Sequence, residues 1–454
     1  MQELQPTDDG QQPRPARRWQ GLPLRSTDRC KQVCVALRRS RGAADPVSGS
    51  GLGLSICLRL IDEFIATQAP TITLHLIITT RDKLKGDDTI YRLGQRLRRR
   101  PRNERIDLGK YVFLTSEQLD LTSLRSVQAL SEKLLRTLPR IDVVILNAGY
   151  GGYTAINWPR AIWQILTDFP AAVTYPTYQI AGVGYTTKRQ TASLDDEPPL
   201  GQVFCSNVFG HYMLVSYLAP VLTQATSGHL ASRRPRVIWI SSLEAYASAL
   251  SRTDIQGLAS SNAYKSSKRL TDILALTSSL PSSHPGASRL LDSTEAKPPD
   301  MYLAHPGICA TSFVPLNTIL YYLMTLALYL ARWIGSPWHT VSPHKGACAP
   351  VWLTLALQEE LDALEADGKS KWGSCVDVFG NERVTRTEVE GWGLRGKIER
   401  LGAEQRRGRR RGVVDLTEEE RQGFMELGRQ CWEQMDELRE QWRGRLAVQA
   451  RSSL

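Results

Sequence analysis

Residues 141–149 read Ile-Asp-Val-Val-Ile-Leu-Asn-Ala-Gly, and this stretch decides the fold class. Its first six residues form an apolar, β-branched run that is typical of a strand buried on both faces of a sheet. A glycine is the third residue after the run, and its bare backbone lets another group approach closely. The stretch therefore predicts a buried parallel strand whose C-terminal end borders a binding site.

Similar apolar runs recur along the chain and alternate with helical patterns. Further strands are predicted at residues 71–79, 111–115, 237–241 and 301–305. Helices with one apolar face are predicted at residues 54–65, 85–100 and 123–138. Strands that alternate with helices indicate an α/β protein with a Rossmann-like, doubly wound parallel sheet.

The bulk composition is that of a globular protein with a basic surface. The 454 residues are 42% hydrophobic and 23% charged, with a net charge of +11. Arginines cluster at residues 96–105 and 406–411. The first interpretation of these clusters is a solvated face, and a contact with an anionic membrane surface is the next. Nucleic acid is third, because no aromatic residues are interleaved with the arginines. The scattered cysteines predict free thiols in a reducing compartment and no metal site.

A tyrosine and a lysine stand four residues apart in Ser261-Asn-Ala-Tyr-Lys-Ser-Ser-Lys268. On a helix, Tyr264 and Lys268 would lie one above the other. A lysine ammonium lowers the pKa of a neighbouring phenol, so such a tyrosine can pass a proton to a substrate oxygen near neutral pH. Ser242, at the end of a predicted strand, would hold that oxygen, with Ser241 as the alternative. The spacing alone is more often a solvated helix face.

A glycine-rich turn precedes the first predicted helix. Gly51 and Gly53 would let the backbone approach a pyrophosphate at the helix N-terminus. The first glycine of the usual pattern is replaced by Val47, and the segment before it is a poor strand because arginines and a proline interrupt it. After the next predicted strand come Thr80 and Arg81, where an NAD enzyme tends to place a carboxylate. A neutral and a cationic residue there suit the 2′-phosphate of NADP.

Polar or glycine residues also follow the remaining strands. They are Asp120, the Asn147-Ala-Gly149 turn, Asn207 on a later helix, the Pro306-Gly307 pair, and Thr311. Each is by itself ordinary turn or helix chemistry. Their joint order along alternating strands and helices resembles the short-chain dehydrogenase/reductase family over roughly residues 47–312.

Three longer segments make the resemblance closer. Residues 54–64, 147–163 and 380–392 look like the fungal 3-keto-steroid reductases of sterol C-4 demethylation. The resemblance extends over most of residues 50–395. It implies an NADPH-dependent reductase that converts the 3-keto group of a sterol intermediate to the 3β-alcohol. The chain departs from the family pattern in the long separation between Ser242 and Tyr264, which an inserted loop at residues 243–261 explains.

The resemblance implies a role for each matching catalytic residue. Tyr264 would donate a proton to the substrate carbonyl, and Lys268 would lower the pKa of Tyr264 and hold the nicotinamide ribose. Ser242 would bond the carbonyl oxygen. Asn207 would support a water that relays protons to Lys268. No metal ion is implied.

The resemblance also implies a set of cofactor contacts. The contacts run from the pyrophosphate (Gly51, Leu52, Gly53) and the 2′-phosphate (Arg81) through the adenine and adenosine side (Asp120, Asn147, Gly149) to the nicotinamide end (Tyr264, Lys268, Pro306, Gly307, Thr311).

The chain divides into four predicted parts. Residues 1–46 are an irregular extension that a mis-assembled N-terminus would explain. Residues 47–312 form the NADP-binding reductase domain, with insertions at 151–200 and 280–299, the second a surface loop. Residues 313–345 are an apolar membrane-associated and substrate-entry segment. Residues 346–454 are a C-terminal extension with a long charged helix.

Two helical segments outside the reductase pattern have alternative interpretations. Residues 316–334 are apolar and flanked by tryptophans, which favours a helix docked at a membrane surface over a buried core helix. A full membrane span is the least favoured interpretation. Along residues 416–448 apolar residues recur at intervals of three and four, which favours packing on the chain's own domain over binding a partner.

Location and partners follow from the resemblance. It implies the endoplasmic reticulum membrane, with peripheral or monotopic attachment, and lipid droplets as a further location. It implies a sterol ketone substrate and, as partners, other C-4 demethylation enzymes and the oxidosqualene cyclase. A non-catalytic scaffold of a sterol-enzyme complex, and a reductase of another lipid ketone, are the alternatives.

Overall fold

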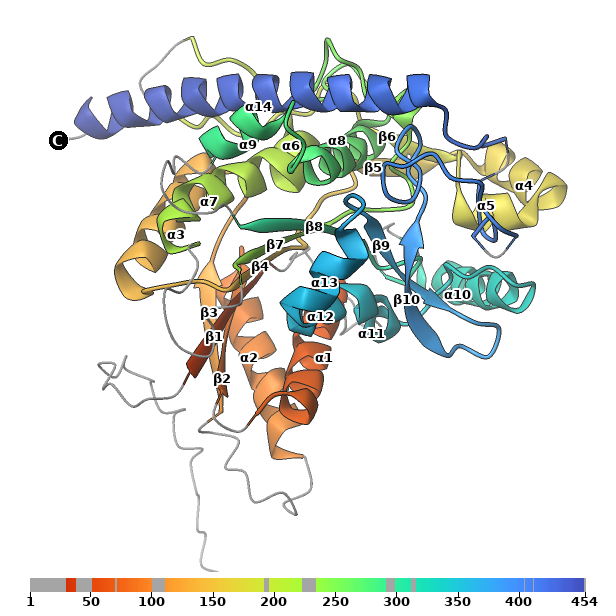
Figure 1. The fold of residues 1–454 in the computed structure, drawn as a ribbon, viewed down its shortest axis with the longest axis horizontal. Coiled ribbons are helices and arrows are strands. Elements are labelled where there is room, and N and C mark those ends of the chain that lie inside the picture. Colours follow the sequence, from red (N-terminus) through yellow and green to blue (C-terminus); the bar gives the residue numbers. More distant parts are fainter. Residues whose placement is uncertain are drawn as a thin grey trace, which may run out of the picture.

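The fold is built on an eight-stranded sheet in the order β10-β9-β8-β7-β4-β1-β2-β3, seen in the computed structural model of Figure 1. The model describes residues 30–37, 51–69, 72–99, 111–191, 196–222, 234–290, 299–311, 316–403, 405–410 and 412–452. The strands are β1 (Cys30–Leu37), β2 (Ile72–Thr80), β3 (Val112–Gln118), β4 (Val143–Leu146), β7 (Arg236–Ile240), β8 (Asp300–His305), β9 (Lys371–Val376) and β10 (Glu382–Thr387). In this sheet, neighbouring strands from β9 through β8, β7, β4, β1 and β2 to β3 pair in parallel, and β10 runs antiparallel to β9. The predicted doubly wound α/β fold is confirmed.

Helices cover both faces of the sheet and enclose two apolar cores (Figure 1). One face is covered by α1 (Leu52–Thr67), α2 (Lys83–Arg98), α12 (Cys348–Leu355) and α13 (Gln358–Glu365). The other is covered by α3 (Leu124–Thr137), α7 (Gly210–Leu218) and α8 (Ala263–Thr277). Because strands buried on both faces need apolar residues throughout, β4 and β7 are buried at every position.

Strand β1 corrects the prediction that residues 1–46 are an irregular extension. Cys30–Leu37 pairs in parallel with both β2 and β4, so it lies in the centre of the sheet. The prediction failed because Arg38, Arg39 and Arg41 were taken to interrupt a longer strand, whereas β1 ends before the first of them. Val47 and the start of the glycine turn lie outside the described residues.

The C-terminal extension, predicted to be helical, also contains two strands of the sheet. It contributes β9, whose Lys371 lies opposite Leu303 of β8, and then β10. Between the first glycine turn and β9 lie the shorter helices α6 (Gln202–Phe204), α9 (His284–Leu290) and α11 (Pro343–Gly346). Helix α9 occupies part of the predicted surface loop at residues 280–299. The sequence of β9 shows no alternation of polar and apolar residues that would predict a strand. The strand is buried because β8, β10 and the covering helices surround it.

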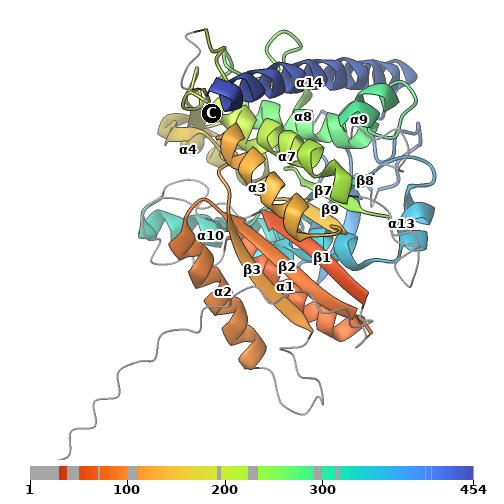
Figure 2. The same cartoon turned by 90° about the vertical axis from the view of Figure 1, so that its left-hand side faces the viewer.

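The long C-terminal helix α14 (Glu418–Ser452) lies across α8 and α9, as both views show (Figures 1 and 2). Its apolar stripe is buried against the chain's own domain, at Phe424, Cys431, Trp432, Met435 and Trp442. The indole of Trp432 donates a hydrogen bond to Thr277 of α8. The interpretation that this stripe packs on its own domain is therefore confirmed.

The first insertion and the apolar segment lie on the same side of the molecule in both views (Figures 1 and 2). The insertion contains β5 (Tyr153–Ile156), α4 (Trp158–Thr167), α5 (Phe169–Thr174) and β6 (Gln179–Ala181). The apolar segment forms α10 (Thr318–Trp333), which packs on α5.

Half of the residues of α10 are exposed and only three are buried, so the alternative of a buried core helix is wrong. Its exposed side chains are Ile319, Tyr322, Leu323, Leu326, Tyr329, Leu330 and Trp333. On α4 the exposed apolar side chains are Trp158, Ile162, Trp163, Ile165 and Leu166. Across the described part of the chain, no helix is both long enough and apolar enough to cross a bilayer.

Candidate active site

The predicted tyrosine and lysine lie together on α8, at the C-terminal end of β7. Tyr264 and Lys268 are 8% and 5% exposed, which excludes a solvated helix face. The Lys268 ammonium lies 5.8 Å from the centre of the Tyr264 ring and donates a hydrogen bond to the carbonyl of Ile240 at 2.7 Å. The helix therefore carries a phenol and a fixed cation against the strand end.

The two serines after β7 make different hydrogen bonds. The Ser241 hydroxyl donates to the carboxylate of Asp272. The Ser242 hydroxyl accepts a hydrogen bond from the backbone N–H of Glu244 at 3.2 Å, which leaves its own proton for a substrate oxygen. Ser242 is therefore the better match to the predicted role, and Ser241 is committed to the protein.

Asn207 lies in a π-helical turn (Cys205–Phe209) and is 1% exposed. Its carbonyl oxygen accepts from the backbone N–H of Tyr150 at 2.6 Å and from Ser206 at 3.0 Å. Its amide donates to the Tyr150 carbonyl and to the Ser267 hydroxyl of α8. In this structure Asn207 joins the turn after β4 to the catalytic helix. Its support of a relay water stays a prediction.

Gly149 brings the turn after β4 close to the same groups. A β-carbon added at Gly149 would lie 3.2 Å from the Asn207 carbonyl oxygen and 3.9 Å from the Lys268 ammonium. A side chain at this position would therefore crowd Asn207 and touch Lys268. Asn147, two residues earlier, is partly exposed at the end of β4. The backbone at Gly149 therefore lies close to both Asn207 and Lys268.

A buried histidine stands beside the lysine. Burial and the charge of Lys268 lower the pKa of His211 to about 3, so its imidazole is neutral at physiological pH. His211 packs edge-on against Trp239 of β7. Lys268 therefore supplies the positive charge at this point.

The first turn of α1 fits the pyrophosphate of a dinucleotide. Gly51 precedes the helix, and a β-carbon added there would meet nothing within 4 Å. The first turn, which begins at Leu52 and Gly53, contains no acidic residue. Its orphan backbone N–H groups and the helix dipole favour an anion.

The end of β2 carries a threonine and an arginine and no carboxylate. Thr80 is buried, and Arg81 is exposed at the strand end. The next residue, Asp82, is the first carboxylate after the strand, but its side chain accepts from the backbone N–H of Leu84 at 2.9 Å and so caps α2. The carboxylate nearest to the expected ribose site therefore already has a structural role.

The remaining predicted cofactor residues lie at other strand ends. Asp120 follows β3, and its carboxylate holds the N–H and hydroxyl of Thr122. Gly307 follows β8 with a φ of +68°, a conformation that favours glycine. The carbonyl of Pro306 accepts from the Thr340 hydroxyl at 3.0 Å. Thr311 is partly exposed beyond this turn.

Sequence reasoning missed a polar cluster beside Tyr264. The ring of Tyr153, from the first insertion, lies 5.8 Å from the Tyr264 ring, and its hydroxyl reaches Glu244 at 3.4 Å. The Glu244 carboxylate faces the Lys265 ammonium at 3.6 Å, and burial raises the pKa of Glu244. The position of Glu244, two residues after Ser242, was the signal available in the sequence.

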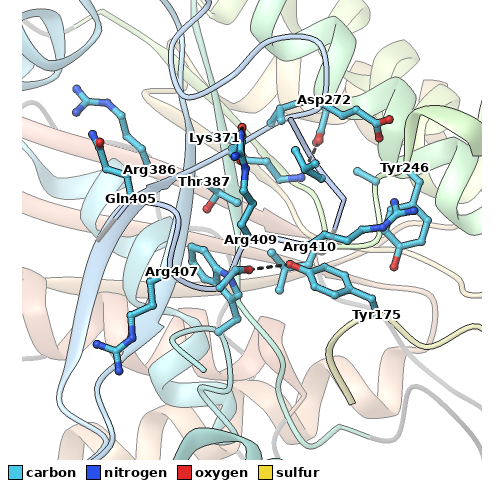
Figure 3. A pocket seen from close by; sticks show the side chains of 18 residues that line it. Tyr175, Tyr246, Asp272, Lys371, Arg386, Thr387, Gln405, Arg407, Arg409 and Arg410 are labelled. Carbon is cyan, nitrogen blue, oxygen red and sulfur yellow. Dashed lines mark hydrogen bonds and ion pairs between the residues drawn. The ribbon is translucent and has the colours of Figure 1, made fainter. Parts of the chain in front are cut away.

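A second missed pair is Asp272 and Lys371, which line a cavity near the end of β7 (Figure 3). Leu243 and Tyr246 also line the cavity, together with arginines of the 405–410 segment. Its lining does not include Tyr264, Lys268, Ser242 or Asn207. Asp272 was detectable from sequence because it falls one helical turn after Lys268, whereas nothing local marks Lys371.

A buried tyrosine and lysine beside a strand-end serine, set on a doubly wound sheet with a glycine turn, place the chain among the short-chain dehydrogenases/reductases. No family model matches the sequence. The 3-keto-steroid reductase erg27 of Aspergillus fumigatus is 46% identical over 418 residues, covering 87% of this chain and 92% of that protein. The 3-keto-steroid reductase ERG27 of Gibberella zeae is 39% identical over 456 residues, covering 88% and 94%.

The chain belongs to the family of fungal 3-keto-steroid reductases. Among solved structures, menthone neomenthol reductase from Mentha piperita aligns with a TM-score of 0.38 and 17% identity over 72% of this chain and 95% of that chain. This likeness is too weak to add to the argument.

The different bonds of the two serines predict different effects of their removal. Ser242→Ala should lower kcat for a ketone substrate by roughly 100- to 1000-fold, as expected for loss of one donor to a developing oxyanion. Ser241→Ala should lower the free energy of unfolding by about 1–3 kcal/mol, because Asp272 loses a buried partner, with a much smaller effect on kcat. Steady-state kinetics and thermal melting measure the two effects. The reverse pattern would make Ser241 the catalytic hydroxyl.

Proposed function

We propose that the protein reduces the 3-keto group of a C-4-demethylated sterol intermediate to the 3β-alcohol with NADPH, in ergosterol-type sterol biosynthesis. The observation that carries the proposal is the arrangement of Tyr264, Lys268 and Ser242 at the end of β7. The extent of the match to the Aspergillus and Gibberella relatives, which are named for this substrate class, supports the choice of substrate.

The residues of the site suit each step of a carbonyl reduction. The nicotinamide supplies the hydride when it is bound. Tyr264 donates the proton to the carbonyl oxygen, and the Ser242 hydroxyl donates a hydrogen bond to the same oxygen as negative charge develops. The Lys268 ammonium, held by the Ile240 carbonyl, stays next to the phenol and favours its loss of the proton. The buried site keeps these groups in place before the substrate arrives.

Two alternatives keep part of this arrangement. A scaffold without activity would not need Tyr264, Lys268, Ser242 and Asn207 to be brought together. A reductase of another lipid ketone would use the same residues, so only the choice of substrate separates it from our proposal.

The first experiment is NADPH oxidation by the detergent-solubilised protein with a 3-keto sterol. Turnover should vanish in Tyr264→Phe while NADPH binding remains, because the ring is kept and the proton donor is lost. Turnover of long-chain acyl or retinoid ketones in place of the sterol would favour another lipid substrate. Stoichiometric NADPH binding without turnover of any ketone would favour the scaffold.

Preference for NADPH over NADH tests the role of Arg81. Arg81→Ala should raise the KM for NADPH roughly 10- to 100-fold and leave the KM for NADH nearly unchanged, because a charge-assisted contact to the 2′-phosphate is worth about 1.5–3 kcal/mol. Lys83→Ala is the matched control, since Lys83 is also an exposed cation of this region and pairs with Asp87. An equal rise in both KM values would contradict the assignment.

The apolar face of α4 and α10 leads us to propose peripheral attachment to a membrane. We define this apolar face as the exposed side chains of the two helices named above. Arg332 is the single charged residue of α10, and it turns inward to the carbonyls of His339 and Thr340. The outer side of α10 therefore presents no charge to its surroundings, which is unusual for a water-facing helix.

A lipid surface suits this face better than a protein groove because cations flank it. The exposed Arg407 lies beside Gly335 at the end of α10, where an added β-carbon would be 3.0 Å from its guanidinium. Arg406 and Arg410 are exposed in the same segment. Apolar and aromatic side chains bordered by arginines suit insertion among anionic headgroups. The endoplasmic reticulum membrane and lipid droplets are the proposed locations, with C-4 demethylation enzymes and the oxidosqualene cyclase as proposed partners.

Vesicle flotation tests the attachment. The wild-type protein should float with vesicles of phosphatidylcholine that contain phosphatidylserine, and Trp163→Asp with Leu326→Asp should weaken binding at least roughly tenfold, because charge replaces inserted apolar area. Val448→Asp on α14 is the matched control, since Val448 is 57% exposed at the far end of that helix. Equal flotation of both variants, or none by the wild type, would contradict the proposal. Melting curves check that each variant is folded.

A further inference from the structure

We propose that Lys371 and Asp272 are positioning residues that fix Ser242 for catalysis, so that the C-terminal extension completes the active site. The inference rests on the proposed reductase function. Lys371 begins β9, well outside the residues 47–312 that carry the reductase motifs. Its side chain nevertheless reaches the strand end that holds the catalytic serine.

The contacts of Lys371 are short and buried. Its ammonium donates to the carbonyl of Ser242 at 2.6 Å and to the carboxylate of Asp272 at 2.7 Å. The side chains of Lys371 and Asp272 are 3% and 1% exposed. Figure 3 shows the two side chains pointing toward one another. The ammonium therefore joins the catalytic helix α8 to the backbone of Ser242.

Three consecutive residues at the end of β7 are each held by a different side chain. Lys268 binds the carbonyl of Ile240, Asp272 accepts from the hydroxyl of Ser241, and Lys371 binds the carbonyl of Ser242. Lys268 and Asp272 come from one face of α8, because they are four residues apart. Lys371 adds the third hydrogen bond, from β9. The strand end is thereby fixed relative to Tyr264, which shares that face of the helix.

Stability alone is a poor explanation for this pair. Removing two charges from water is costly, and a well-packed apolar pair of similar size is often at least as stable as a buried ion pair. Burial lowers the pKa of Lys371, and the Asp272 carboxylate opposes that shift. What an apolar pair would lack is a donor for the Ser242 carbonyl. A displacement of about 1 Å at a reacting group costs roughly 100-fold in rate, so this donor matters for catalysis.

The first test is Lys371→Met, measured by steady-state kinetics. We expect kcat to fall roughly 10- to 100-fold, because Ser242 loses its fixed position. The KM for the ketone and the Kd for NADPH should change by less than about threefold, because a positioning role gives Lys371 no contact with either ligand. Lys369→Met is the matched control, since Lys369 is two residues away and forms a comparable pair with Glu365. It should change stability and leave kcat unchanged.

A second variant separates positioning from folding. Lys371→Met alone leaves Asp272 as an unpaired buried carboxylate, which destabilises the fold. Adding Asp272→Asn removes that charge and keeps an acceptor for Ser241. The double variant should recover the melting temperature and keep the loss of kcat. Recovery of both would mean that the pair only stabilises the fold, and would overturn the proposal.

A double-mutant cycle tests whether Lys371 acts through Ser242. In a Ser242→Ala background, Lys371→Met should have almost no further effect on kcat, because the group it positions is already gone. Additive effects would overturn the proposal. Hydrogen exchange gives a readout that needs no substrate. The amides of residues 242–246 should exchange faster in the Lys371→Met, Asp272→Asn variant than in the wild type. Unchanged exchange would overturn the proposal even if no ketone is turned over, whereas a wild type without turnover counts against the proposed function.

Discussion

The parallel pairing of β1 with β2 on one side and β4 on the other is the constraint on which the structure depends. It sets the point where the strand order reverses, and in such sheets ligands bind beyond the C-terminal strand ends at this point. The first turn of α1, Arg81 after β2 and Gly149 after β4 are brought to one edge by this pairing. Each has little meaning alone, and together they suit one dinucleotide.

The catalytic groups depend on burial of α8. All fifteen of its residues are buried between the sheet and α14, so Tyr264 and Lys268 sit on a helix that has little freedom to move. Side chains held by packing and by hydrogen-bonded neighbours keep catalytic geometry better than side chains on a loop. Asn207, Asp272 and Lys371 add polar connections from three different elements. The C-terminal extension thus contacts the site in two places: α14 packs on α8, and Lys371 of β9 binds Asp272 and the carbonyl of Ser242.

The apolar face of α4 and α10 lies apart from this rigid region. Both helices belong to segments inserted after a sheet strand, β4 for α4 and β8 for α10. Such segments tolerate exposed apolar groups because the core does not depend on them. The proposed attachment to a membrane would bring this face into contact with the phase in which a sterol substrate dissolves.

The sequence by itself determined the strands with continuous apolar runs, the Tyr264–Lys268 spacing, the serine pair and the strand-end glycines, because periodicity and turn chemistry are local properties. It did not determine that Cys30–Leu37 is a central strand, since a short strand next to arginines lacks a pattern of its own. Nor did it distinguish Ser242 from Ser241, or reveal Lys371, because those facts depend on hydrogen bonds between residues far apart in the chain. The exposure of α10 was likewise decided by tertiary packing, since an apolar helix can face a core or a surface with the same sequence.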